Sequence, residues 1–353
     1  LLLGPGREVL RREPFPVDDL PVFHAELPGV LTKGDGVPSA DKGGWPCFRG
    51  ADGDPSRYES EVWYHLGDAR FDADDNPGAI AAYEASMRAA EPRAGARERS
   101  PFWAKALYKR SWAHFRRPGG YVDAVRGFAQ LLDHHERTGL DAAARGNRAD
   151  ALRWIGVIFS EGEWDPATPA PEAARCQALV EALASPPPDA PRPFDCAGIL
   201  RLAAPFTPEA LVRAALDDRP PTVPAGAGYI PQDRGWTPDA WLELASDYLL
   251  QTKHYEAIAL YRLFLARFPM HVRAPDAVES IAAAYTRQRR FEEAIAARER
   301  MQRYVEGGPW WEANRDHPDA LRAAERRARD VLHDVALERH RSATQLRQQA
   351  VAL

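Results

Sequence analysis

The sequence lacks the motifs that identify most enzymes. Its 353 residues contain no G-x-S-x-G, no phosphate-binding loop of the Walker type and no G-x-G-x-x-G followed by a strand. No run of residues alternates polar and apolar side chains for long enough to build a sheet. These absences argue against hydrolases and nucleotide-binding enzymes. We therefore expect an all-α protein that is not an enzyme and needs no cofactor.

Cysteines and long apolar runs are also scarce. The three cysteines are Cys47, Cys176 and Cys196, with no C-x-x-C spacing, so neither a disulfide framework nor a structural zinc site is expected. A Cys176–Cys196 pair remains a lesser alternative. No apolar run approaches the ~18 to 20 residues that span a bilayer, which predicts no membrane span. The net charge of −5 predicts no general affinity for nucleic acid or anionic membrane.

Two stretches have the composition of metal sites but not the spacing. "DADDN" at Asp72–Asn76 has Pro77 where a calcium loop needs glycine, and Tyr83 where it needs a bidentate glutamate. It is predicted to be a turn between helices. "DHHE" at Asp133–Glu136 places adjacent histidines about 100° apart on a helix, so they cannot share a metal ion. They are predicted to be solvated near a helix end, and no metal site is expected.

What the sequence does contain is a helical hairpin that recurs at a fixed period. The first copy spans Trp241–Pro269, with large and small residues alternating on the facing surfaces and a short turn at 251–254. The pattern returns over Val278–Met301. Tyr248 and Tyr285 are 37 residues apart, and the alanines that open the second helices have the same separation. A fixed period in this range predicts a stacked helical array.

Further copies lie upstream, over 63–92 and 107–131, the latter with one residue added in its turn at 117–120. A degenerate copy begins at Ala151, with its second helix expected at Pro171–Leu183. The internal spacing resembles the tetratricopeptide repeat, whose unit is about 34 residues long. The resemblance implies an all-α, right-handed superhelical solenoid of antiparallel helix pairs. A long apolar-striped helix over about Pro318–Gln348 is expected to cap it, with proline- and glycine-rich irregular segments elsewhere.

Composition shifts divide the chain. We expect an irregular Gly/Pro-rich lead-in at 1–58 and a block of tetratricopeptide-like repeats at 59–184. A Pro-rich linker or insert with short helices is expected at 185–235. A pair of tetratricopeptide-like repeats at 236–305 and the capping helix at 306–353 complete the chain. The run "SPPPDAPRP" at Ser185–Pro193 is interpreted either as a stiff spacer or as an inserted binding segment.

Candidate binding residues follow from the resemblance, which implies that the first helix of each repeat lines a concave groove. Arrays that bind chaperone tails place lysine and asparagine there, whereas Leu242, Ser246, Glu279 and Ala283 hold such positions here. The upstream block instead has aromatic residues edged by cations, which are typical interface anchors. The predicted partner-binding residues are Tyr64, Phe71, Lys105, Tyr108, Arg110, Trp112, Phe115 and Arg116. That some of these rings pack between repeats remains an alternative.

Three stretches resemble the large tetratricopeptide proteins of deltaproteobacterial cell envelopes, including the gliding-motility type of the myxobacteria. They are "FWAKALYKRSWAHFRR" at Phe102–Arg117, "HYEAIALYRLFLARFP" at His254–Pro269 and "WWEANRDHPDALRAAE" at Trp310–Glu325. The resemblance implies a protein-binding scaffold in a cell-envelope or motility complex, located in the bacterial periplasm or envelope. The alternative is a regulatory domain of a larger chain. Since the sequence begins at Leu1 rather than methionine, a targeting or catalytic part is then expected upstream.

Overall fold

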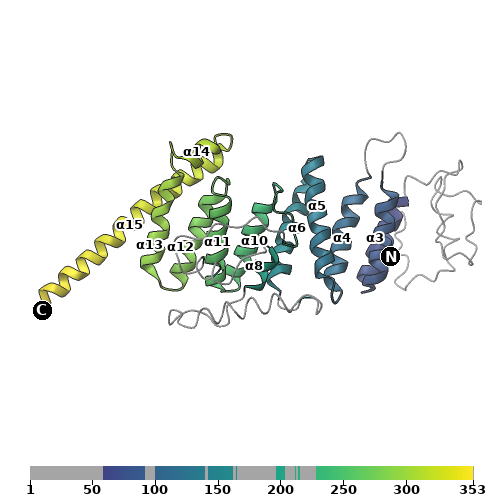
Figure 1. Cartoon of the computed structure of the whole chain (residues 1–353), viewed down its shortest axis with the longest axis horizontal. Helices are drawn as coiled ribbons and strands as arrows, with labels where there is room; N and C mark the ends of the chain where they lie inside the picture. Colours follow the sequence, from purple (N-terminus) through teal and green to yellow (C-terminus); the bar gives the residue numbers. More distant parts are fainter. Residues whose placement is uncertain are drawn as a thin grey trace, which may run out of the picture. The chain divides into compact units, whose positions relative to one another are not determined.

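The fold is helical throughout its described parts, as the sequence predicts (Figure 1). The chain divides into two compact units, Leu1–His134 and His135–Leu353. The expected lead-in and the expected helix at Pro171–Leu183 lie outside the described residues. The computed structural model describes residues 59–91, 100–139, 142–161, 164, 196–202, 211, 214 and 228–352.

Unit 1 is built from helices that pack against their neighbours in sequence. Its elements are α2 (Glu59–Asp72), α3 (Asn76–Ala89), α4 (Phe102–Arg116) and α5 (Tyr121–Thr138) as far as His134. Helix α2 packs against both α3 and α4. Gly67 has no side chain because the Tyr83 ring fills that space, 2.5 Å from where a Cβ would stand. The small–large pairing expected of a helical hairpin is therefore present between α2 and α3.

Unit 2 contains a longer series of helices. They are α6 (Ala142–Ser160), α8 (Ala197–Leu202), α10 (Thr237–Leu250), α11 (His254–Arg267), α12 (Ala274–Arg287), α13 (Phe291–Glu299), the 3₁₀ helix η3 (Arg300–Tyr304), α14 (Pro309–Ala313) and α15 (Pro318–Ala352). Helix α10 packs against α6 and α11, and α12 packs against α11 and α13 (Figure 1). The two hairpins predicted from the 37-residue period are thus α10–α11 and α12–α13.

The turns inside three hairpins share one geometry. Asp74, Thr252 and Arg289 adopt left-handed backbone conformations, with φ of 63°, 62° and 59°. Each lies two residues after one helix ends and two before the next begins. Backbone hydrogen bonds of 2.9 Å close the turns, from Asp75 N to Arg70 O, Lys253 N to Tyr248 O and Arg290 N to Tyr285 O. This is the Schellman motif, so the same helix stop recurs in both units.

Helix α11 is buried on every side. Each residue from Tyr255 to Phe264 is buried, including Arg262. One Arg262 nitrogen donates to the Ala214 carbonyl at 3.2 Å, and another donates to the Tyr285 hydroxyl at 2.8 Å. A residue of the 185–235 segment therefore covers a face of α11 that a single row of hairpins would leave open.

Helix α8 of the 185–235 segment is also packed into unit 2. Arg201 donates to the Phe159 and Glu161 carbonyls at 2.8 and 2.7 Å, and its guanidinium lies 4.4 Å from the Trp164 ring. A Cβ on Gly198 would stand 2.7 Å from the Phe159 carbonyl oxygen, so helix α8 approaches the end of α6 closely. These residues form a layer against α6 and α11.

The C-terminal elements are fastened to the bend between α11 and α12. The Trp310 indole donates to the His271 carbonyl at 2.7 Å, and the Asn314 amide donates to the Met270 carbonyl at 3.0 Å. Trp310 is buried, whereas Trp311 is partly exposed. Helix α15 packs against α13 and η3. The last hairpin is thus covered by the terminal helix, as an end cap would cover it.

Candidate protein-interaction surface

Helix α4 carries an unusual side-chain set. Its sequence FWAKALYKRSWAHFR contains aromatic residues and cations but no aspartate or glutamate. Tyr108, Trp112 and Phe115 follow one another by four and three residues, so they lie on one face of the helix. All three side chains are partly exposed. This face of α4 is therefore aromatic and partly exposed.

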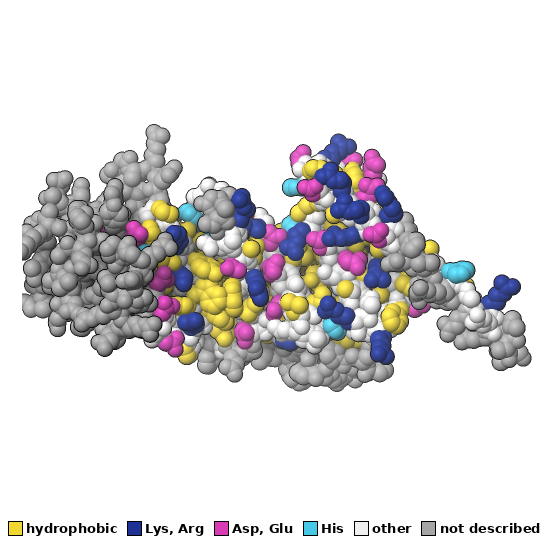
Figure 2. All heavy atoms as spheres, turned by 180° about the vertical axis from the view of Figure 1, so that it is seen from behind, with side chains coloured by type: hydrophobic (Ala, Val, Ile, Leu, Met, Phe, Trp, Pro, Cys, Tyr) yellow, Lys and Arg dark blue, Asp and Glu magenta, His cyan; other side chains and the backbone are white. Residues whose placement is uncertain are grey.

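The exposed rings continue onto the start of α5. Phe115 stacks on Tyr121 with centroids 5.4 Å apart and planes at 26°, and Trp112 stands edge-on to Phe115 at 5.9 Å and 76°. Tyr108 meets the buried Phe128 at 6.0 Å. We call Tyr108, Trp112, Phe115 and Tyr121 the α4 aromatic surface. Figure 2 shows hydrophobic side chains gathered over the helices of unit 1, bordered by charged ones.

The other predicted aromatic residues lie on the α2 side of α4. The Tyr64 ring contacts Phe102 at 5.4 Å, and the Lys105 ammonium lies 4.8 Å from the centre of that Phe102 ring. Phe71 is buried, with the Arg116 guanidinium 4.1 Å above its ring. Phe71 therefore belongs to the core of unit 1, while Tyr64 and the exposed Lys105 lie on the surface.

The two arginines among the predicted partner-binding residues form ion pairs with acidic residues of unit 1. Arg110 pairs with Glu84 of α3 at 3.7 Å, and Arg116 pairs with Asp74 of the α2–α3 turn at 4.0 Å. Burial lowers the pKa of Arg110, although Glu84 opposes this shift. These two cations connect α4 to the acidic α2–α3 hairpin, so part of the predicted set holds unit 1 together.

Asp68 is the polar centre of the contact between α2 and α4. It accepts a hydrogen bond of 2.7 Å from the Tyr83 hydroxyl and pairs with Lys109 at 3.6 Å. Burial raises the pKa of Tyr64 to about 12, and the Asp68 charge adds to this effect. Burial also raises the pKa of Tyr83, which donates to the same carboxylate. Both phenols therefore remain protonated donors at neutral pH.

Sequence reasoning missed three members of this region: Phe102, Lys109 and Tyr121. Tyr121 belongs to the next helix and reaches Phe115 because the turn at 117–120 reverses the chain, with Gly119 at a φ of 73°. The added turn residue was visible in the sequence. The stacking of a ring from one helix on a ring of the other was not.

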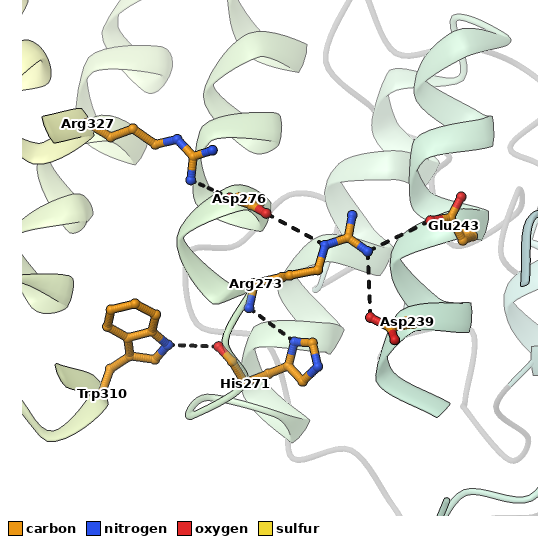
Figure 3. A network of polar contacts seen from close by, with 7 residues as sticks. All are labelled: Asp239, Glu243, His271, Arg273, Asp276, Trp310 and Arg327. Atoms are coloured by element: carbon orange, nitrogen blue, oxygen red, sulfur yellow. Dashed lines mark hydrogen bonds and ion pairs between the residues drawn. The ribbon is translucent and has the colours of Figure 1, made fainter. Parts of the chain in front are cut away.

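Unit 2 carries a row of alternating charges (Figure 3). Asp239 in the first turn of α10 accepts from Arg148 of α6 at 2.6 Å and faces Arg273 at 3.6 Å. Arg273 also lies 3.6 Å from Asp276 of α12, and Asp276 pairs in turn with Arg327 of α15. The row links four helices. Figure 2 shows basic and acidic side chains interleaved on the face of unit 2.

Burial shifts the pKa values of two side chains beside this row of charges, Glu243 and His271. Burial raises the pKa of Glu243, although Arg273, 3.8 Å away, favours the charged form. Burial lowers the pKa of His271, whose Nδ1 accepts from the Arg273 backbone N–H at 3.3 Å. A neutral His271 is the form that accepts this bond, which helps hold the bend between α11 and α12.

The predictions about histidine and metal chemistry have different outcomes. His135 is buried and His134 packs against Trp103 at 4.7 Å, so the prediction that both histidines are solvated is wrong. The prediction considered only the polarity of these side chains, whereas the packing of α5 against its neighbours decides how exposed they are. The "DADDN" stretch is the α2–α3 turn, as predicted. Within the described ranges, no group of three histidine, cysteine or acidic residues has metal-site geometry, and no helix could cross a membrane.

Cys196, directly before α8, is buried and disulfide-bonded. Its partner lies outside the described residues, so the Cys176–Cys196 alternative remains open. Comparison of the chain with protein-family models, with curated proteins and with solved structures gives no match.

Proposed function

We propose that this chain is a non-catalytic scaffold and that unit 1 captures a segment of a partner protein on the α4 aromatic surface. The observation that carries the proposal is the row of partly exposed rings at Tyr108, Trp112, Phe115 and Tyr121. Aromatic side chains bury a large area at a small entropic cost, and they are over-represented among the residues that dominate binding energy.

We infer that the hairpins belong to a tetratricopeptide-like, right-handed superhelical solenoid. Two features support this inference. The same helix stop recurs at Asp74, Thr252 and Arg289, and the first helices α10 and α12 contact each other, as consecutive first helices do in a stacked array. Such arrays bind extended partners along one face, which fits a scaffold role.

We also propose that the scaffold works in a bacterial cell-envelope complex. The disulfide at Cys196 supports this placement, because disulfides persist in oxidising compartments and are rare in the reducing cytosol. Mass spectrometry of the chain extracted with its thiols blocked tests the placement. A free Cys196 thiol in the native chain would remove this support.

The test of partner capture uses Trp112→Ala and Tyr108→Ala in the intact chain. Affinity capture with mass spectrometry identifies the partner, and calorimetry then measures its affinity. We expect each substitution to weaken binding at least about tenfold, as for residues at the centre of an interface. Trp311→Ala is the matched control, because this partly exposed tryptophan lies in unit 2. Unchanged capture by both unit 1 variants, with unchanged circular dichroism, would refute the proposal.

A further inference from the structure

We propose that unit 2 has a binding surface of its own, which takes an extended, acidic segment of a partner protein. The surface lies where the turns of the α10–α11 and α12–α13 hairpins stand side by side. Its members are Leu250, Arg287, Gln288, Arg289 and Phe291, and we call them the turn-end patch. It is separate from the α4 aromatic surface, so it goes beyond the function proposed for unit 1.

Two large apolar side chains stand exposed in this patch. Leu250, the last residue of α10, is 75% exposed, and Phe291, the first residue of α13, is 55% exposed. Within the described ranges, Met270 is the one other exposed large apolar residue, and it lies at the other end of α11. Most of Leu250 and Phe291 is therefore in water, and burying them against a partner is favourable.

Arg287 connects the two apolar side chains. Its guanidinium donates to the Leu249 carbonyl at 3.3 Å, directly beside Leu250, and Phe291 follows Arg287 across the turn. The pKa of His254, the first residue of α11, is lowered by burial and further by the Arg287 charge. The ends of α10, α11 and α12 thus meet around Arg287, and the patch is continuous from one hairpin to the next.

The patch also contains a side-chain amide that lacks the partners of its counterpart. Gln288 comes 37 residues after Gln251, so the two occupy the same place in successive hairpins. The Gln251 amide donates to the Ser160 hydroxyl at 2.9 Å and to the Asp247 carboxylate at 2.6 Å. Gln251 therefore fastens its turn to the preceding helix, α6.

The second hairpin has neither acceptor. Ala284 stands where Asp247 stands in the first hairpin, and Leu250 ends α10 as Ser160 ends α6. Both polar atoms of the Gln288 amide are buried without a hydrogen-bond partner among the residues that the structure describes. A buried unpaired amide is costly, so a ligand that pairs with it gains affinity. Gln288 as a residue is partly exposed, and rotation of its side chain brings the amide to the surface.

These groups fit a peptide better than a lipid surface. The Gln288 amide has an acceptor and donors, which match the N–H and C=O of an extended peptide backbone. A lipid phosphate accepts hydrogen bonds but donates none, so it would leave the Gln288 oxygen unpaired. The apolar side chains of the peptide would then contact Leu250 and Phe291.

The charges of the patch specify the sign of the partner. Arg287 and Arg289 are exposed and pair with no acid in the part of the chain that the structure describes, whereas Arg290 pairs with Glu293 at 2.8 Å. Glu292 is also exposed, but it offsets only one of the two arginines. Carboxylates of the bound segment are therefore the complementary groups.

The test selects phage-displayed random peptides on the intact chain and measures their affinity by fluorescence anisotropy. We expect the selected peptides to combine acidic with large apolar residues. Phe291→Ser should weaken their binding at least about tenfold. Met270→Ser is the matched control and should leave binding unchanged, since Met270 is exposed at the other end of α11. Arg287→Gln combined with Arg289→Gln should weaken binding at least about tenfold and remove most of its salt dependence.

The amide is tested by a second matched pair of variants. Gln288→Ala should weaken peptide binding by a few fold up to about tenfold, the range of a single hydrogen bond. Gln251→Ala should leave binding unchanged, because its amide already has partners within the chain. Unchanged circular dichroism of all variants separates loss of binding from loss of folding.

The opposite results would overturn the inference. They are a selection that yields no peptide above background, peptides without acidic residues, or binding that Phe291→Ser leaves unchanged. Binding to phosphatidylglycerol vesicles that Phe291→Ser abolishes would assign the patch to a lipid surface instead. Self-association in sedimentation velocity that Phe291→Ser abolishes would assign it to a second copy of the chain. Trp112→Ala should leave peptide binding unchanged, so the outcome here is independent of partner capture by unit 1.

Discussion

Units 1 and 2 use the same helical hairpin but treat the faces of its helices differently. In unit 1, α4 leaves the rings of Tyr108, Trp112 and Phe115 partly exposed. In unit 2, α11 is buried from Tyr255 to Phe264, because residues of the 185–235 segment add a layer to the hairpins on either side. The exposure of an aromatic helix therefore depends on which other segments cover it.

The charges of the two units differ in the same way. In unit 1, Lys109, Arg110 and Arg116 of α4 each pair with a different acid of the preceding hairpin. In unit 2, the acids and arginines from Arg148 to Arg327 form one connected row across four helices. The comparison predicts that changes in unit 2 will spread along the array, while changes on the α4 aromatic surface will affect binding first.

The largest effect is expected from Arg262→Leu. The substitution leaves the Ala214 carbonyl and the Tyr285 hydroxyl without their buried donor, at a cost of about 3 kcal/mol. Hydrogen exchange with mass spectrometry should show much faster exchange in α11 and α12. Peptides of α2 to α4 should keep their protection.

The control for this prediction is Arg326→Leu, which alters an exposed arginine of α15. It should leave exchange in α11 unchanged. Equal loss of protection in α2 to α4 after Arg262→Leu would show that both units unfold together, and the distinction drawn above would be lost.

An intermediate effect is expected from Arg273→Met, which removes the arginine shared by Asp239, Glu243 and Asp276. Because Arg273 is partly exposed to water, we expect a loss of about 1 kcal/mol in low salt. At about 1 M salt the Debye length is about 3 Å, so most of the difference should disappear. Urea unfolding at both salt concentrations measures it.

Arg329→Met supplies the comparison for this salt test. Arg329 pairs with Glu325 of its own helix, an exposed pair of a kind worth about 0.3 to 0.5 kcal/mol. If the two substitutions had equal effects, the row of charges would contribute no more than isolated surface pairs, and its role in linking the helices would be refuted.

The smallest effect is expected in the turns. Thr252 is β-branched and has a φ of 62°, a conformation that costs such residues about 1 kcal/mol. Thr252→Gly removes that strain but increases the entropy of the unfolded chain, so we expect a net gain of about 0.5 kcal/mol in thermal unfolding. Thr252→Ala keeps a Cβ and should give no gain.

The equivalent change in unit 1, Asp74→Gly, should give no gain. Aspartate tolerates the left-handed conformation better than threonine, and Asp74 also pairs with Arg116. Equal stabilisation by Asp74→Gly and Thr252→Gly would mean that aspartate and threonine are equally strained at this turn position, which contradicts the prediction.

Much of the helical order could be predicted from the sequence, because a repeated period reports local geometry. The spacing of Tyr248 and Tyr285 located both hairpins of unit 2, and the short turn expected at 251–254 ends where α11 begins. The contact between Arg262 and Ala214 could not be predicted in this way. It joins residues 48 positions apart that share no periodic pattern.

The candidate site was predictable only in part, for a related reason. Helical spacing places Tyr108, Trp112 and Phe115 on one face without any knowledge of neighbours. The burial of Phe71 and the pairing of Arg110 depend on which helices lie beside α2 and α4, and that is a property of the packed unit.

The row of charges in unit 2 also defines a rule for lengthening the array. Asp239 and Asp276 occupy the same place in successive hairpins, and Arg273, just before α12, bridges them. The stretch from Thr237 to Arg273 thus contains an aspartate, Asp239, that pairs with an arginine of the preceding helix. It also contains an arginine, Arg273, that pairs with an aspartate of the following helix. A tandem duplication of this stretch would bring both residues of the ion pair between hairpins with it. The gene could therefore grow by whole repeats without new residues at the contacts between them.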